Sequence, residues 1–520
     1  MTMNNIKILW ADDEIDMLKA HIIFLEEKGY QVTTTNNGGD ALEILQNENF
    51  DVIFLDEQMP GMSGIETLDN LKSIRPNLPV VMITKSEEEN IMEEAFGSRI
   101  EDYLIKPVNP KQILSSLKKI LETKKLADDK STHSYQQEFT KISMELNQNP
   151  NFKEWVDIYK KLVRWELELE TTADSGIRDI LDMQKEEANT VFSKFFEKNY
   201  EDWLHGDAEE VPVLSHTLFR DKIFPFLNDD VPTYLILVDN LRYDQWKTLQ
   251  PIIEENYVTE IDDIYYGIIP SATQYARNSI FSGLLPNEIK KKYPEYWVDE
   301  YEEESKNQYE SELLEQLLKR FGKGDISFSY NKILNLNAGR KLVEKLPNLA
   351  NNKLNVIVYN FIDTLSHART DTEVIKELAE DETAYRSITK SWFEHSPLKE
   401  IINDLADENA RIIITTDHGS VKTKNPVKIL GDRNTNTNLR YKFGKNLQYK
   451  PKEVFEIKDP ESIYLPRINI STSYVFTRNS DFLVYPNNYN HFVNLYKNTF
   501  QHGGISLQEL LVPFAVLNPK

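Results

Sequence analysis

The sequence DVIFLDEQMP, at residues 51–60, shows the pattern that decides the first fold of this chain. A short apolar run of strand length ends at an acidic residue, and a turn with a proline follows it. Four more runs of strand length alternate with helical patterns between residues 6 and 120: IKILW, QVTTT, PVVMIT and DYLIKP. Strands that alternate with helices predict a doubly wound parallel sheet of the α/β class.

Length and composition limit the possible functions. At 520 residues the chain should hold about three domains, at roughly 150 residues per domain. The net charge of −24 argues against a protein that coats DNA. The absence of cysteine excludes disulfides, thiolate zinc sites and cysteine nucleophiles. The sequence shows no signal peptide and no apolar run long enough for a membrane span, so we expect a cytoplasmic protein.

Changes in sequence texture divide the chain into three predicted domains. Residues 1–122 carry the alternating pattern described above. Residues 123–207 form the second segment, where apolar residues recur at helical spacing with few glycines and prolines, which predicts a helical bundle linker. Residues 208–520 form the third, where the runs TYLILV, LNVIVYNF and RIIITT predict the strands of a second α/β domain.

Acidic and basic residues lie at the ends of the predicted strands in the first domain. Asp12 and Asp13 follow the first run and Asp56 ends the third, so three carboxylates can hold Mg²⁺. Thr84 ends the fourth run and Lys106 follows the fifth, so a hydroxyl and an ammonium group can meet a phosphoryl group on Asp56. One acidic residue at a strand end is often only a helix cap. Three aspartates, a threonine and a lysine at successive strand ends together indicate a shared site.

This pattern resembles the receiver domain of two-component response regulators, which has a CheY-like fold. The resemblance implies that Asp56 accepts a phosphoryl group from a sensor histidine kinase. The implied receiver residues are Asp12, Asp13 and Asp56 for Mg²⁺, Thr84 and Tyr103 for switching, and Lys106 for the phosphoryl group. Lys85 departs from the family, which usually has a small residue there, and this affects access to the phosphoryl group.

No helix-turn-helix pattern follows the predicted receiver domain, so DNA binding is not the expected output. Residues 420–452 hold nine lysines and arginines against one acid, Asp432. This basic stretch is either a solvated loop or a positive funnel for a polyanionic substrate.

Three segments of the third domain combine carboxylates with imidazoles: FIDTLSHAR, TTDHGS and QHGGISLQELLVP. Asp363 and His367 are four residues apart, which places both on one face of a helix. Asp417 and His418 lie on the loop after a predicted strand, and His502 precedes two glycines that permit close backbone approach. Asp and His together suit Zn²⁺ or Mn²⁺.

A further carboxylate and a hydroxyl extend this predicted site. Asp239 follows the run TYLILV, so acidic residues follow all three runs and should meet at one edge of the sheet. Thr273 begins a helical pattern after the turn PSAT, and a helix N-terminus attracts phosphate. A metal at that hydroxyl would lower its pKa and make it a nucleophile. Arg277, one helical turn later, can reach a phosphate oxygen.

These segments resemble the PglZ domain of the alkaline phosphatase superfamily, in which two metal ions, normally zinc, lie close together. The resemblance implies a phospho-enzyme on Thr273, with Ser271 as the competing hydroxyl. The implied metal ligands are Asp239, Thr273, Asp417 and His418 for one ion, and Asp363, His367 and His502 for the other. Ala276 stands where related nucleotide pyrophosphatases have a phosphate-binding Asn, a role that Arg277 or Asn278 can take.

The order of receiver, helical linker and PglZ domain resembles the response regulators linked to type IX secretion in Bacteroidetes. This resemblance implies a homodimer on phosphorylation, and contact with a sigma factor or a secretion-motor component. The leading hypothesis is a zinc-dependent phosphodiesterase for nucleotides or oligonucleotides that Asp56 phosphorylation controls. The alternative is a phosphorylation-controlled signalling scaffold in which the metals are structural.

Overall fold

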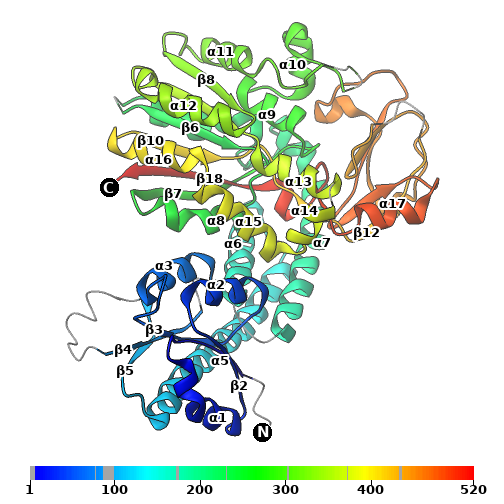
Figure 1. Cartoon of the computed structure of the whole chain (residues 1–520). Coiled ribbons are helices and arrows are strands. Elements are labelled where there is room, and N and C mark those ends of the chain that lie inside the picture. Colours follow the sequence, from blue (N-terminus) through cyan, green and yellow to red (C-terminus); the bar gives the residue numbers. More distant parts are fainter. Residues whose placement is uncertain are drawn as a thin grey trace. The chain divides into compact units, whose positions relative to one another are not determined.

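The computed structural model describes residues 6–520, except 76–77, 86–98, 171–174, 230, 301, 303, 372 and 432–435. Contacts divide the chain into two units, Met1–Ser134 and Tyr135–Lys520. Figure 1 shows the elements of both units in sequence colours. No helix in the described part of the chain is long and apolar enough to cross a membrane.

The first unit is the predicted doubly wound sheet. Its five strands are all parallel and lie in the order β2-β1-β3-β4-β5. Every residue of β3 and β4 is buried, because helices cover both faces of a parallel sheet. The elements are β1 Ile6–Ala11, α1 Lys19–Glu27, β2 Tyr30–Thr35, α2 Gly38–Asn47, β3 Val52–Asp56, α3 Gly64–Ile74, β4 Val80–Thr84, β5 Asp102–Ile105 and α5 Pro110–Asn147.

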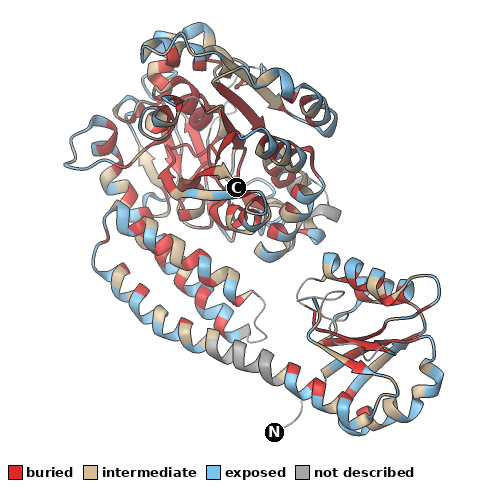
Figure 2. Ribbon diagram, turned by 90° about the vertical axis from the view of Figure 1, so that its left-hand side faces the viewer, coloured by how far each residue is buried: buried red, intermediate tan, exposed pale blue. Residues whose placement is uncertain are grey.

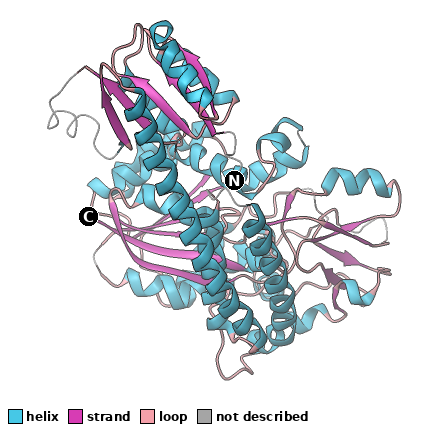
Figure 3. Cartoon of the chain, turned by 90° about the horizontal axis from the view of Figure 1, so that it is seen from below, coloured by secondary structure: helices cyan, strands magenta, loops and turns pink. Residues whose placement is uncertain are grey.

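The helical linker was also predicted correctly. It consists of the end of α5 with α6 Phe152–Leu169 and α7 Ser175–His205, which belong to the helices drawn in cyan in Figure 3. Asn151 caps α6 in a capping box with Glu154, which satisfies the free N–H groups of the first turn. The buried stripe of α6 repeats at helical spacing and packs against α7 and the third domain. The linker therefore shares one core with the C-terminal α/β domain.

A six-stranded sheet in the order β7-β18-β10-β6-β9-β8 forms the centre of the C-terminal domain. Strands β10, β6, β9 and β8 are parallel, and β18 and β7 are antiparallel additions. Every residue of β6, β9 and β10 is buried, whereas the edge strands β8 and β7 are only partly buried, and the central strands are red in Figure 2. The register pairs Val238 and Ile333 with Tyr359, and Thr415 with Leu237, so the parallel strands end level with each other.

Helices and loops connect these strands across both faces of the sheet. The elements in sequence order are β6 Thr233–Val238, α8 Tyr243–Ile253, β7 Tyr257–Tyr266, α9 Thr273–Ser282, α10 Pro286–Lys292, α11 Glu310–Arg320, β8 Phe328–Ile333, α12 Leu336–Leu349, β9 Leu354–Tyr359, α13 Phe361–Asp371, α14 Glu373–Leu378, α15 Glu382–Glu394, α16 Pro397–Asp407, β10 Arg411–Thr415 and, at the end, α18 Leu507–Leu510 and β18 Leu511–Pro519.

A smaller β-rich insertion lies in sequence between β10 and β18 and is orange in Figure 1. Its elements are β11 Val421–Lys422, β12 Asn425–Lys428, β13 Tyr441–Gly444, β14 Phe455–Ile457, β15 Ser473–Phe476, β16 Asp481–Val484, α17 Tyr489–Tyr496 and β17 Phe500–Gln501. Strand β17 pairs with β11, which returns the chain to a point close to the end of β10. The insertion thereby places the residue after β17, His502, near the carboxyl edge of the large sheet.

Candidate metal centre and nucleophile

The predicted acidic residues meet at the carboxyl edge of the large sheet. Asp239 directly follows β6, Asp417 lies two residues after β10, and Asp363 is in the first turn of α13, which follows β9. Because these strands are parallel and end level, their following loops share one edge. The described residues form two groups there that could each hold a metal ion.

The first group contains Asp239, Asp417 and His418, and all three are buried. His418 Nε2 lies 3.7 Å from Asp239 Oδ1 and 3.9 Å from Asp417 Oδ2. The other ring nitrogen, Nδ1, is 3.1 Å from the carbonyl oxygen of Gly419. Because a carbonyl oxygen only accepts, Nδ1 carries the proton and the Nε2 lone pair faces the carboxylates.

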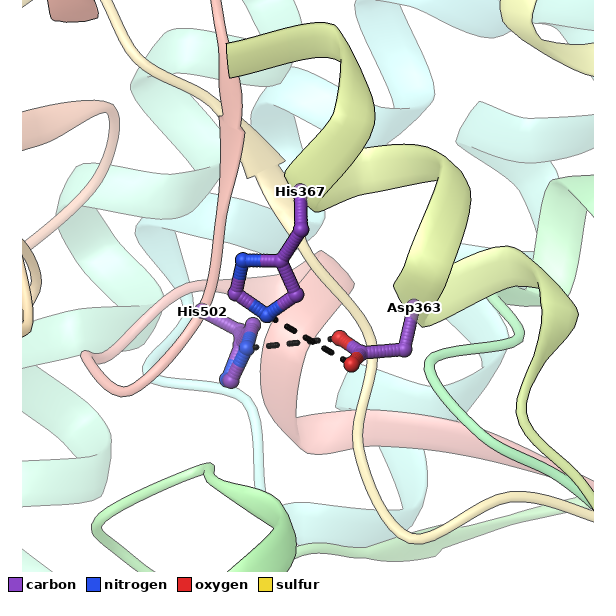
Figure 4. Close-up of side chains that lie close together, drawn as sticks. All are labelled: Asp363, His367 and His502. Atoms are coloured by element: carbon purple, nitrogen blue, oxygen red, sulfur yellow. Dashed lines mark ion pairs between the residues drawn. The ribbon is translucent and has the colours of Figure 1, made fainter. Parts of the chain in front are cut away.

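The second group contains Asp363, His367 and His502, which Figure 4 shows in close-up. His367 Nε2 lies 3.4 Å from Asp363 Oδ2, and His502 Nε2 lies 3.5 Å from Asp363 Oδ1. His502 Nδ1 donates to the Ser271 carbonyl at 3.1 Å, which again leaves Nε2 free to bind a metal. Burial, with a smaller contribution from His418, lowers the pKa of His502 to about 3, so the ring stays neutral at ordinary pH.

The two groups lie beside each other. The rings of His418 and His502 stack with their centroids 4.2 Å apart. Asn240 joins the groups, since its backbone N–H donates to Asp417 and its side-chain amide donates to Asp363, both at 3.4 Å. Its φ of 65° lies in the left-handed region, which Asn tolerates better than most residues. The two groups are therefore adjoining candidate metal sites.

The charge of this cluster fits bound cations. Burial raises the pKa of Asp239 well above its usual value, although Arg277 lies beside it, and three more carboxylates, Asp417, Asp363 and Glu310, add to the rise. Asp417 Oδ2 is buried and accepts no hydrogen bond from any described residue. Buried carboxylates in excess over cationic side chains are unfavourable unless a further cation compensates them. Divalent ions at the two groups would supply that charge.

The structure separates the two candidate hydroxyls, Thr273 and Ser271. Thr273 is the first residue of α9, and its Oγ1 lies 3.1 Å from His418 Nε2 and 3.5 Å from Asp239 Oδ1. The Ser271 hydroxyl is fully buried, donates to the carbonyl oxygen of Gly504 and accepts from the N–H of Gly503. Only Thr273 of this pair faces the first metal group.

Arg277 lies among carboxylates. Its Nη2 is 2.6 Å from Asp239 Oδ2, and its Nε is 3.2 Å from both Glu310 Oε1 and Asp417 Oδ2. The remaining terminal nitrogen donates to Asn360 at 3.3 Å. In this structure the guanidinium therefore holds the first metal group in place, and the predicted contact with a substrate phosphate stays a prediction.

Two further residues lie next to Arg277, Asn278 in the sequence and Glu310 in space. Asn278 donates to the Lys306 carbonyl and accepts from Asn307, so its amide is used within the protein. Glu310, at the start of α11, is almost fully buried beside Arg277, and sequence reasoning missed it. Its segment carries no motif, and a glutamate in the first turn of an amphipathic helix is too common to indicate a functional site.

Three of the described cations in the basic stretch at residues 420–452 form ion pairs. Lys424 pairs with Glu186 of the linker at 2.6 Å, and Lys450 pairs with Glu453 at 2.9 Å. Arg440 is fully buried against Glu509 at 2.6 Å. Asp432 and Arg433 lie outside the described residues. Three of the described cations are thus neutralised within the protein, and the funnel for a polyanionic substrate stays a prediction.

Arg440 and Glu509 support the turn that carries His502. Glu509 accepts from the N–H of Gly504 at 2.8 Å, and a Cβ at Gly504 would lie under 3.0 Å from Arg440. The chain therefore needs glycine where it passes this ion pair.

Replacement of Arg440 by Met is expected to lower the free energy of unfolding by about 3–5 kcal/mol, because it leaves the Glu509 carboxylate buried without its partner. Urea denaturation of the purified chain measures this change. Lys450→Met in the same segment removes an exposed ion pair and should cost less than about 1 kcal/mol. Equal losses in the two variants would contradict the role given to the buried pair.

The receiver residues also come together at strand ends. Asp12, Asp13 and Asp56 form a third group that could hold a metal ion. Lys106 Nζ lies 3.0 Å from Asp56 Oδ2 and 3.2 Å from Asp12 Oδ2. Burial raises the pKa of Asp56 to about 6, against the opposing hydrogen bond from Lys106.

The predicted switch residues, Thr84 and Tyr103, lie on β4 and β5. The Thr84 hydroxyl, at the end of β4, donates to the Glu57 carboxylate. Tyr103 is half-buried and packs against one of the two cores of the first unit. Lys85 is exposed.

Comparison with protein families identifies all three parts of the chain. A family model for the BREX system PglZ alkaline phosphatase-like domain matches residues 218–517. A model for the PorX response regulator linker domain matches residues 125–204. A model for the response regulator receiver domain matches residues 8–118.

Curated relatives match the receiver part. The transcriptional regulatory protein ZraR of Escherichia coli K12 is 36% identical over 121 residues, which are 23% of this chain and 27% of that protein. The CpxR homolog of Haemophilus influenzae is 36% identical over 117 residues, 22% of this chain and 50% of that protein. The chain thus spans between about a quarter and a half of these relatives.

Solved structures of receiver domains are similar to the same part. The CheY-like receiver domain protein from Methanospirillum hungatei is 29% identical, with 24% of this chain and 98% of that chain covered and a TM-score of 0.22. The Francisella response regulator receiver domain is 28% identical, with 23% and 98% covered and a TM-score of 0.22. Since the PglZ model matches more than half of the residues, the chain belongs to the PglZ family of alkaline phosphatase-like proteins, and it carries that domain behind a response regulator receiver domain and a PorX-type linker.

Proposed function

We propose that this chain is a zinc-dependent phosphodiesterase whose activity is controlled by phosphorylation of Asp56. The observation that carries the proposal is the position of Thr273 Oγ1, between His418 Nε2 and Asp239 Oδ1 at the N-terminus of α9. A structural metal site has no need of a hydroxyl at that place. The free N–H groups at a helix N-terminus also favour a phosphate group next to this oxygen.

The chain's own residues supply the nucleophile and its orientation. The Thr273 oxygen bonds to phosphorus, its proton goes to solvent, and the leaving oxygen departs in line with a proton from water. Water then hydrolyses the phosphothreonine and restores the hydroxyl. Asp239, Asp417 and His418 would hold one Zn²⁺, and Asp363, His367 and His502 the other. These ions would lower the pKa of the hydroxyl and stabilise the charge on the transferring group.

Removal of metal is expected to reduce hydrolysis of a chromogenic phosphodiester to the uncatalysed rate, because the Thr273 hydroxyl then keeps its proton and nothing stabilises the charge on the transferring group. The measurement is turnover by the purified chain after dialysis against a chelator, with residual metal determined by elemental analysis, and again after Zn²⁺ is added back. The corresponding monoester serves as the control for substrate class. Full turnover by verified metal-free protein would exclude this mechanism.

The remaining parts of the proposal concern control and substrate. The receiver domain implies a phosphodonor such as a sensor histidine kinase. We propose that Mg²⁺ binds at Asp12, Asp13 and Asp56, and that phosphorylation promotes a homodimer through the face near Tyr103. The PorX-type linker supports a role in type IX secretion, with a sigma factor or a secretion component as partner. Nucleotides or oligonucleotides are the proposed substrates.

A further inference from the structure

A buried ion-pair network connects the linker helices to the loops that carry the metal ligands. It runs from Glu166 on α6 through Arg386 on α15 to Asp244 on α8, and ends at Arg242. The side chains of Arg386, Asp244 and Arg242 are less than 5% exposed, so solvent screens their interactions weakly. None of these residues belongs to the metal groups or to the nucleophile.

The linker end of the network is Glu166. Its Oε1 accepts from Arg386 Nη1 at 2.7 Å, and its Oε2 accepts from Lys185 of α7 at 2.6 Å. The same Nη1 of Arg386 lies 2.9 Å from Asp244 Oδ2, and Nη2 lies 3.2 Å from Glu170. Arg386 is thus held by Glu166 and Glu170 of the linker on one side and by Asp244 of α8 on the other.

The other end of the network is Arg242, whose Nε donates to Asp244 Oδ1 at 2.9 Å. Arg242 lies three residues after Asp239, in the loop between β6 and α8. Its Cγ packs beside Gly419, where an added Cβ would lie 3.4 Å from it and only 2.0 Å from the Gln508 carbonyl oxygen. Gly419 accepts the hydrogen bond that orients His418. The guanidinium also lies over the ring of Phe500, 5.2 Å from its centroid, on the strand that precedes His502.

Arg242 therefore touches three segments that carry predicted metal ligands. A shift of its side chain would move the loop after β6, the loop after β10 and strand β17 together. Glu166, Asp244 and Glu382 themselves approach closely enough to resemble a cation site. However, Lys185, Arg386 and Arg242 each make ion pairs with these carboxylates, so the charge of this cluster is already compensated within the protein.

We propose, on the basis of the metal-dependent function above, that Glu166 is a positioning residue for the metal centre. It fixes Arg386 and Asp244, and through them the side chain of Arg242, in the arrangement that holds Asp239 and His418 at metal-binding geometry. The linker thereby sets the metal affinity of the C-terminal domain. Residues that orient metal ligands commonly change affinity by about 10–100-fold when they are replaced.

The test is the Zn²⁺ dissociation constant of the full chain with Glu166→Gln, measured by competition with a chromophoric chelator. We expect binding to weaken about tenfold. A polar cavity of about 370 Å³ adjoins Glu166, Lys185 and Arg386, so water can solvate the amide and the variant should fold. Glu145→Gln is the matched control, because Glu145 is another linker carboxylate bound to a lysine, Lys161, at 2.6 Å, outside the network. It should bind Zn²⁺ like the unaltered chain.

A second measurement separates positioning from a general loss of stability. Glu166→Gln breaks a buried ion pair and should melt at a lower temperature than Glu145→Gln, whose pair is partly exposed. Both metal-free proteins should nevertheless be fully folded at the temperature of the Zn²⁺ titration, where only Glu166→Gln binds Zn²⁺ weakly. In a double-mutant cycle with Arg386→Gln, the effects on Zn²⁺ affinity should be less than additive, since both act through one chain of contacts. Unchanged affinity in Glu166→Gln, or equal losses in the two variants, would overturn the proposal.

Two outcomes keep this test distinct from that of the proposed function. If the unaltered chain binds no Zn²⁺ and hydrolyses no phosphodiester, the proposed function fails and the positioning role fails with it. If the unaltered chain binds and turns over normally but Glu166→Gln does the same, only the positioning role fails. Should Glu166→Gln not fold, Glu170→Gln replaces it, because Glu170 also binds Arg386, and unchanged affinity there counts against the role equally.

Discussion

Replacement of Thr273 by Ala is expected to lower kcat for phosphodiester hydrolysis by roughly 10⁴-fold or more, the scale found when an enzyme loses its nucleophile. The physical reason is that Thr273 Oγ1 faces both His418 and Asp239. The carboxylate and imidazole side chains of both metal groups stay in place in this variant. Steady-state turnover and bound metal must be measured on the same preparation. Thr273→Ser keeps the oxygen and should retain part of the activity.

Ser271→Ala is the matched control for this prediction. The Ser271 hydroxyl bonds to the backbone of Gly503 and Gly504 and is fully buried, so its loss should cost about 1–3 kcal/mol of unfolding free energy. Turnover should fall much less than in Thr273→Ala. The reverse result, with activity lost in Ser271→Ala and kept in Thr273→Ala, would show that Ser271 is the nucleophile and that the prediction is wrong.

Replacement of Asp56 by Asn is expected to abolish incorporation of a phosphoryl group from acetyl phosphate and Mg²⁺. Asp56 Oδ2 is 3.0 Å from Lys106, and Asp12 and Asp13 complete the only group of this kind found in the described residues of the receiver. Phosphate-affinity electrophoresis measures the incorporation. An amide at this position has no oxygen with the charge needed to attack phosphorus.

Asp51→Asn is the control for Asp56, because Asp51 precedes the same strand and accepts a hydrogen bond from the Lys7 backbone. It should be phosphorylated like the unaltered chain. Sizing chromatography of the same samples tests the proposed homodimer, which should form with the unaltered chain and not with Asp56→Asn. A phosphorylated band in Asp56→Asn would mean that another residue accepts the phosphoryl group.

The sequence was sufficient to predict which carboxylates and histidines meet, because strand ends of a parallel sheet share one edge. Asp239, Asp363 and Asp417 each follow a strongly apolar run, and that pattern is visible without coordinates. The helical spacing of Asp363 and His367 is equally visible, and α13 is indeed a helix.

Other features depend on contacts between residues far apart in sequence, which no local pattern encodes. The roles of Arg277 and Glu310 follow from a side-chain approach between α9 and α11. The orientation of His502 depends on the carbonyl of Ser271, more than two hundred residues earlier. The difference between Ser271 and Thr273 also appears only when the Gly503–Gly504 turn packs against the first of them.

The place of β18 in the large sheet has a consequence for the order in which the protein is made. This strand is the last in sequence, yet it lies between β7 and β10. A nascent chain on the ribosome that has not reached residue 511 therefore exposes both of those strand edges, which are prone to pair with other chains. His502 emerges shortly before β18, so the second metal group and the closed sheet can form only after the chain has been made through β18.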